Sequence, residues 1–121
     1  MKGVGIDAVE VARFRAVLLR RPRLRERMFT RAELAALAGR ADPVPSLAVR
    51  FAAKEATMKV LRTGIGGVDF ADVEVLAASD GSPRLWLSGR AEARAESLGM
   101  RDWHVSLTHT EATATAIVIA G

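Results

Sequence analysis

The chain has 121 residues, of which half are hydrophobic and 26% are charged, a balance typical of one globular domain spanning residues 1–121. It contains no cysteine, which excludes disulfide frameworks and thiolate metal sites. It also contains no apolar run of membrane-spanning length, and no signal-peptide pattern follows Met1. We therefore expect a free-standing cytoplasmic protein.

Hydrophobic spacing in the first half predicts one strand followed by three helices. These elements are the strand at residues 3–9 and the helices at residues 9–19, 30–39 and 46–63. Pro22 interrupts the first helix, and Thr30 with Glu33 forms a capping-box pattern at the start of the second. The two-proline stretch 41–45 predicts a loop, with Ser46 as the N-cap of the long third helix.

The second half is richer in alternating and β-branched sequence. It predicts strands at residues 72–77, 84–88, 103–108 and 112–119, and a helix at residues 89–98. A turn at 79–83 joins the first two of these strands into a hairpin, and Gly99 follows the helix at its C′ position. This order predicts an α+β fold, with a mainly antiparallel sheet packed against a long helix.

The long helix carries the most informative cluster of charges. At about 100° per residue, Lys59 lies about 40° from Glu55 and Arg62 about 20° to the other side. A stripe of apolar residues lies well away from this trio and consists of Val49, Ala53, Ala56 and Val60. A carboxylate binds divalent metals and cations bind phosphate, so the trio indicates phosphate chemistry. The alternative is an ordinary solvated helix pair of Glu55 with Lys59.

Asp7 lies near the end of the first predicted strand. It is either the N-cap of the following helix or the second carboxylate of a metal site with Glu55. One carboxylate from a strand and one from a helix suit Mg²⁺, which keeps several waters and binds substrate phosphates. A glycine-rich stretch at residues 63–67 follows the long helix rather than opening one, so it is no dinucleotide fingerprint. It either ends the helix or lets the backbone approach a ligand.

The strand at residues 103–108 alternates polar and apolar side chains. Alternation places His104, Ser106 and Thr108 on one face, which is either a binding patch or a solvated sheet surface. The second histidine, His109, falls on the opposite face, which argues against a zinc site. Between residues 13 and 27 there are seven arginines and one acid, which indicate an anionic partner or a merely solvated face.

Four motifs in chain order carry a resemblance to a known family. They are Gly-Val-Gly-Ile-Asp-Ala-Val-Glu at residues 3–10, Arg-Phe-Ala-Ala-Lys-Glu-Ala at residues 50–56 with Lys59, Thr-Gly-Ile-Gly at residues 63–66, and His-Val-Ser-Leu-Thr-His at residues 104–109. Together they resemble the holo-acyl-carrier-protein synthases, the small class of 4′-phosphopantetheinyl transferases, over nearly the whole chain. The resemblance implies the 4′-phosphopantetheinyl transferase-like fold.

The resemblance also implies roles for individual residues. Asp7 and Glu55 would bind Mg²⁺ with the diphosphate of coenzyme A, and Lys59 would contact that diphosphate; these three residues would be catalytic. The expected coenzyme A contacts are Arg50, Lys59, Gly64, Gly66, Pro83, His104, Ser106 and Thr108. Arg13, with its basic neighbours Arg20 and Arg21, would contact an acidic acyl carrier protein. Family members are typically homotrimers with the pocket between subunits.

The implied reaction transfers the 4′-phosphopantetheine arm of coenzyme A to a serine of an apo carrier protein, with release of 3′,5′-ADP. The carrier belongs to fatty-acid, polyketide or peptide synthesis, and the sequence leaves all three open. The base is either Glu55 or a metal-bound water that Glu55 orients; we favour the water, because a bound cation lowers the pKa of its ligand. The competing functions are a catalytically silent carrier-protein scaffold and a basic nucleic-acid-binding module.

Overall fold

The computed structural model describes residues 1–64 and 66–121. In chain order, the elements are β1 (Gly3–Glu10), α1 (Val11–Arg20), α2 (Leu24–Met28), α3 (Arg31–Leu37), α4 (Val44–Val60), the 3₁₀ turn η1 (Phe70–Asp72), β2 (Val73–Ala77), β3 (Pro83–Leu87), α5 (Gly89–Ser97), β4 (Trp103–His109) and β5 (Thr113–Ala120). Within this part of the chain, no helix combines the length and the apolar character needed to cross a bilayer.

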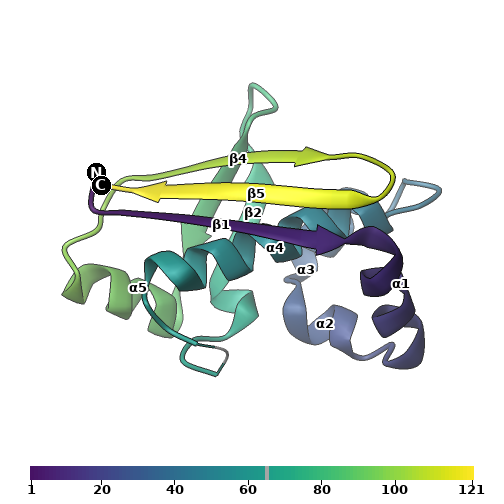
Figure 1. The fold of residues 1–121 in the computed structure, drawn as a ribbon, viewed down its shortest axis with the longest axis horizontal. Coiled ribbons are helices and arrows are strands. Elements are labelled where there is room, and N and C mark those ends of the chain that lie inside the picture. Colours follow the sequence, from purple (N-terminus) through teal and green to yellow (C-terminus); the bar gives the residue numbers. More distant parts are fainter. Residues whose placement is uncertain (65) are drawn as a thin grey trace.

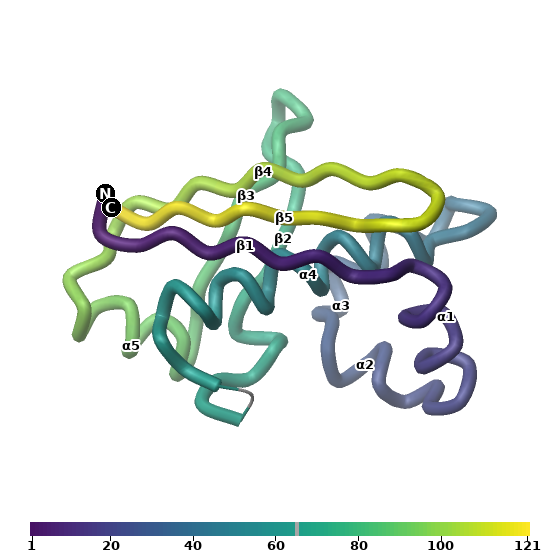
Figure 2. The backbone as a smooth tube through the Cα atoms, in the orientation of Figure 1, coloured from purple at the N-terminus to yellow at the C-terminus, as the bar shows by residue number. Residues whose placement is uncertain are grey.

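The strands form two antiparallel sheets around the long helix α4. One sheet has the strand order β1-β5-β4, and β2 with β3 forms the second, two-stranded sheet. Figure 1 shows the three-stranded sheet lying along α4, with α1, α2 and α3 gathered at one end of it and α5 at the other. The two chain ends lie side by side in Figure 2, where the Lys2 amide donates a hydrogen bond to the Ala120 carbonyl.

Small residues form the contact between the three-stranded sheet and α4. On β5, the side chains that face the helix are Ala114, Ala116, Val118 and Ala120, all of which are buried. On α4, the predicted apolar stripe is buried as expected. A Cβ atom added to Gly5 on β1 would lie 2.2 Å from the Ala56 carbonyl oxygen. The backbone of β1 therefore touches the backbone of α4 at a distance that only glycine permits.

A fully buried ion pair links α4 to the rest of the core. The Lys54 ammonium lies 2.8 Å from the Glu33 carboxylate on α3, and both side chains are 0% exposed. Lys54 also donates hydrogen bonds to the Phe70 and Val73 carbonyls, and Glu33 accepts one from the Val75 amide. Every charged atom of the pair has a hydrogen-bond partner. Through these hydrogen bonds, the pair connects α3, α4, η1 and β2.

Most predicted elements are confirmed, but both bounds of α4 are corrected and one short helix is added. The capping box of Thr30 and Glu33 forms as predicted. Ser46 is not the N-cap of α4: the helix begins at Val44, after Pro43, because proline fits the first turn of a helix. The helix also ends at Val60 rather than Thr63. The basic stretch after Pro22 contains the short helix α2, which the sequence analysis did not predict.

The contact between β1 and α4 makes Gly5→Ala destabilising. We expect the free energy of unfolding to fall by about 1–3 kcal/mol, because the new methyl group meets backbone that cannot rotate away. Urea-induced unfolding would measure the change. Gly39→Ala is the matched control, since a Cβ there meets nothing within 4 Å. Its effect should stay below about 1 kcal/mol, and equal losses from the two variants would contradict the close approach.

Candidate active site

The strand β1 and the helix α4 bring Asp7 and Glu55 to one cavity. Asp7 lies two residues after Gly5 and so shares its helix-facing side of β1. Glu55 directly precedes Ala56, the residue that Gly5 touches. Both acids line a cavity of about 350 Å³. The two predicted metal ligands, 48 positions apart in the chain (55 − 7), are therefore brought together.

The charges at this cavity are coupled. Burial raises the pKa of Glu55, the negative charge of Asp7 raises it further, and Lys59 acts in the opposite direction. The Lys59 ammonium lies 3.1 Å from the Asp7 carboxylate and also donates a hydrogen bond to the Ile6 carbonyl. Lys59 therefore pairs across to the strand, rather than along the helix with Glu55. The interpretation as an ordinary solvated helix pair is wrong for these residues.

The donor set fits a cation that needs few protein ligands. Within the described residues, no group of three or more His, Asp or Glu side chains is placed to hold a metal. Two half-buried carboxylates that repel each other fit Mg²⁺, which binds through one or two carboxylates and takes its other ligands from water and phosphate. Burial and the negative charge of Asp7 raise the pKa of Glu55, and a divalent cation bound by the two carboxylates would offset both effects.

Arg62 does not belong to the charged trio in the predicted manner. It lies beyond the end of α4 and has a φ of 56°, in the left-handed region. The angle of 100° per residue therefore does not apply to it. The Arg62 side chain does not follow the helical spacing because α4 ends at Val60, three residues before the predicted end at Thr63.

The cavity continues from the acids onto an apolar floor. Phe14 and Val17 of α1, Met28 of α2 and Phe51 of α4 line this floor, and Arg13 lies at the rim with the two acids. Arg20 and Arg21 are exposed further along the same segment. The predicted partner-binding arginines therefore begin directly beside the acidic pair.

Arg50 is half-buried one and a half turns before Glu55 on α4. Its guanidinium donates to the Ser46 carbonyl, and its Nε has no hydrogen-bond partner among the described residues. Burial lowers the pKa of Arg50, and the charge of Arg40 lowers it further. Arg40 itself donates to the Ser46 hydroxyl. The two guanidinium groups are thus neighbours at the start of α4, a proximity that the sequence analysis did not predict.

Gly64 and Gly66 follow the end of α4 at which Lys59 lies. Both are exposed, and Gly66 has a φ of 96° that favours glycine. Ile65, within the predicted glycine motif, lies outside the described residues. The Thr63 hydroxyl is buried without a hydrogen-bond partner among the residues described.

The remaining predicted coenzyme contacts lie elsewhere on the chain. Pro83 and His104 line a second cavity of about 460 Å³ together with Arg84 and Arg101, and neither Asp7 nor Glu55 reaches it. His104, Ser106 and Thr108 are exposed on the side of the sheet that faces away from α4, which confirms the predicted polar face of the strand. In a single chain, the predicted contacts thus form two separate groups.

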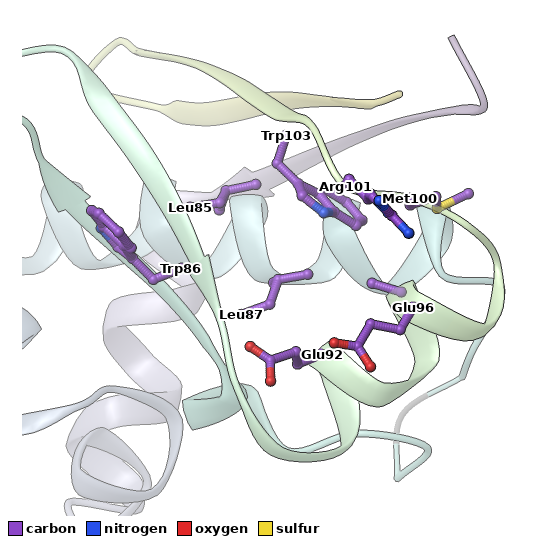
Figure 3. A pocket seen from close by; sticks show the side chains of 9 residues that line it. Leu85, Trp86, Leu87, Glu92, Glu96, Met100, Arg101 and Trp103 are labelled. Atoms are coloured by element: carbon purple, nitrogen blue, oxygen red, sulfur yellow. The ribbon is translucent and has the colours of Figure 1, made fainter.

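A third cavity, of about 540 Å³, lies between β3, α5 and β4. Figure 3 shows Leu85 and Leu87 from β3, Glu92 and Glu96 from α5, and Trp103 from β4 around it. None of the predicted site residues lines this cavity. Its two glutamates would repel a diphosphate, so its size alone does not make it the coenzyme site.

Comparisons with known proteins identify the family of this chain. The model of the 4′-phosphopantetheinyl transferase superfamily matches residues 3–116. The holo-[acyl-carrier-protein] synthase of Streptomyces griseus is 49% identical over 118 residues, which cover 98% of this chain and 96% of that protein. The structure of the Neisseria meningitidis holo-[acyl-carrier-protein] synthase is 30% identical, with a TM-score of 0.90 over 100% of this chain and 98% of that one.

A Bacillus anthracis holo-(acyl-carrier-protein) synthase, solved in complex with CoA (3′,5′-ADP), is 33% identical, with a TM-score of 0.80 over 98% of this chain and 95% of that one. These structures confirm the predicted α+β fold, in which a mainly antiparallel sheet packs against a long helix. The chain belongs to the 4′-phosphopantetheinyl transferase superfamily and, within it, to the holo-[acyl-carrier-protein] synthases.

Proposed function

We propose that the protein transfers the 4′-phosphopantetheine arm of coenzyme A to a serine of an apo acyl carrier protein, in the cytoplasm, with Mg²⁺ and with release of 3′,5′-ADP. The observation that carries the proposal is the convergence of Asp7 and Glu55, beside Lys59, on one cavity. The names of the relatives support the reaction, and the coenzyme A complex of the Bacillus anthracis protein supports the donor.

In this reaction, the serine hydroxyl oxygen forms a bond to the β-phosphorus of coenzyme A, and the bond from that phosphorus to the oxygen of 3′,5′-ADP breaks. Asp7 and Glu55 would hold Mg²⁺, which when bound neutralises charge on the diphosphate. The Lys59 side chain is 55% exposed, so it can turn from Asp7 to the departing phosphate. The backbone at Gly64 and Gly66, just beyond the end of α4 at which Lys59 lies, would hold the other phosphate groups.

The serine proton needs an acceptor. We place this proton on a water molecule oriented by the Glu55 carboxylate, because a carboxylate that ligates a cation has a lowered pKa and is a poor base. Arg13 lines the cavity and is exposed, and we propose that the carrier protein approaches on this side. An acidic carrier would be attracted to the arginines of α1 and α2, which speeds encounter and makes it depend on salt.

We further propose that the protein is a homotrimer with its active sites between subunits. The outer face of the three-stranded sheet supports this, because it exposes apolar side chains: Val4 is 56%, Ile6 58% and Ile117 36% exposed. In the sheet register, Ile6 pairs with Ile117, which in turn pairs with Ser106. The predicted coenzyme contacts on β4 thus continue the same face that a second copy would cover.

The transfer itself is tested by mass spectrometry of the carrier. Wild-type protein with apo carrier protein, coenzyme A and Mg²⁺ should add one phosphopantetheine mass to the carrier. EDTA or Glu55→Gln should lower the rate by roughly 10²-fold or more. Glu96→Gln, which removes the same charge from an exposed position on α5, is the control and should keep full activity. No mass gain with fatty-acid, polyketide and peptide carriers would favour the scaffold or the nucleic-acid binder.

The raised pKa of Glu55 predicts how stability depends on pH without metal. A raised folded-state pKa means that protonation of Glu55 stabilises the fold below its ordinary pKa of about 4.3, and that this stabilisation is lost as the pH rises through the folded-state value. Glu55→Gln mimics the protonated form. In EDTA at pH 7, the variant should therefore be more stable than the wild type, with the gap closing towards pH 4.

Urea unfolding from pH 4 to pH 8 measures this gap. Added Mg²⁺ should stabilise the wild type and leave Glu55→Gln nearly unchanged, because only the wild type keeps both carboxylates. A gap that widens as the pH falls would contradict the direction of the shift.

The position of Arg13 at the rim predicts a selective effect on the carrier. Arg13→Glu should raise the KM for the carrier protein by about tenfold or more and change the KM for coenzyme A by less than about twofold. Arg90→Glu makes the same change of charge on the distant helix α5 and is the control. Steady-state kinetics with each substrate varied in turn measures both values. Equal effects on the two KM values would show that α1 is not the docking surface.

A further inference from the structure

The end of α4 is held by a side chain from another helix. The Arg94 guanidinium of α5 donates a hydrogen bond of 3.0 Å through Nε to the carbonyl of Leu61, the residue that follows α4. Leu61 is fully buried and Arg94 is half-buried. Carbonyl groups at a helix C-terminus lack intrahelical partners and carry partial negative charge, so a cation there both caps and stabilises the helix.

The next residue, Arg62, has a left-handed backbone conformation. Its φ of 56° is the only positive value among the non-glycine residues that the structure describes. Arg62 occupies the C′ position of a Schellman motif, in which backbone hydrogen bonds hold this conformation. The Arg62 amide donates to the Lys59 carbonyl, and the Thr63 amide donates to the Met58 carbonyl. The turn is therefore tied directly to the backbone of the proposed catalytic lysine.

The other end of the connection between α4 and β2 is held in a similar way. The buried Lys54 ammonium donates a hydrogen bond of 3.0 Å to the Phe70 carbonyl, where η1 begins. Two cations, one from α4 and one from α5, therefore fix the backbone before and after the predicted glycine contacts. Arg94 is the more accessible of the two and makes no ion pair among the described residues. Among the described residues, its guanidinium donates a hydrogen bond to a backbone carbonyl alone.

We infer that Arg94 is a positioning residue for the diphosphate of coenzyme A. By holding the Leu61 carbonyl, it anchors the end of α4 to α5, and so sets where the chain leaves Lys59 towards Gly64. This inference rests on the proposed function, in which Lys59 and the glycines receive the diphosphate. Arg94 touches neither substrate nor metal ligand in this role; it acts through the backbone.

Arg94→Gln tests the inference, with Arg94→Lys as the conservative variant and Arg90→Gln as the control. Arg90 lies one turn earlier on α5, and its contact is an ion pair of 3.3 Å with Asp69 in which both side chains are largely exposed. Such exposed pairs contribute little to stability. Three readouts separate positioning from general stability: the Kd for 3′,5′-ADP with Mg²⁺ by calorimetry, the KM for each substrate, and amide hydrogen exchange at Arg62 and Thr63.

Arg94→Gln should weaken 3′,5′-ADP binding and raise the KM for coenzyme A by about tenfold, which corresponds to about 1.4 kcal/mol. The KM for the carrier should change by less than about twofold, and exchange at Arg62 and Thr63 should become faster. Arg94→Lys should recover part of the affinity, because an ammonium can still donate to the Leu61 carbonyl. Arg90→Gln should match the wild type in all three readouts.

The inference is overturned if Arg94→Gln binds 3′,5′-ADP as tightly as the wild type, whether or not exchange changes. It is also overturned if both KM values rise together with a fall in melting temperature, since that pattern indicates general destabilisation. A wild-type protein that transfers nothing and binds no 3′,5′-ADP would instead overturn the proposed function. In that case, amide exchange at Arg62 and Thr63 would still test whether Arg94 holds the turn. Faster exchange in Arg94→Gln would show that it does, and unchanged exchange would show that it does not.

Discussion

The close approach of β1 to α4 is the constraint on which the site depends. Gly5 has no side chain, and the carbonyl oxygen of Ala56 occupies the place where a Cβ would lie. Asp7 is two residues along the strand from this contact, and Glu55 is one residue back along the helix. A side chain at position 5 would push β1 away from α4 and so separate the two acids. The small side chains thus serve the chemistry as well as the packing.

The adjacent residues Lys54 and Glu55 of α4 carry charges in two different environments. Lys54 points into the core, where burial lowers its pKa and the Glu33 carboxylate opposes that shift. Glu55 points to the cavity rim, where burial and Asp7 raise its pKa. Breaking a fully buried pair costs about 3–5 kcal/mol, so Lys54 and Glu33 hold the helix firmly. The unpaired acid next to them is left available for a ligand.

The motifs predicted the acidic pair and Lys59, because their spacing reflects strand alternation and helix period. They did not predict Arg40 beside Arg50, or Arg94 at the end of α4. The first contact depends on the path of the loop before α4, and the second joins two helices that are far apart in sequence. No local sequence pattern encodes either contact. The error at Ser46 has a different origin: a proline in the first turn resembles a loop signal, although it is compatible with a helix.

The separation of the predicted coenzyme contacts has a geometric consequence for the proposed trimer. Asp7, Glu55 and Lys59 lie where β1 meets α4, whereas His104 and Pro83 line the cavity beside β3 and β4. These are two different surfaces, so a pocket that joins them across subunits requires a heterologous contact. Contacts of this kind close into rings when the rotation permits. A closed ring of three would use both surfaces of every chain and would hold as many complete pockets as it has subunits.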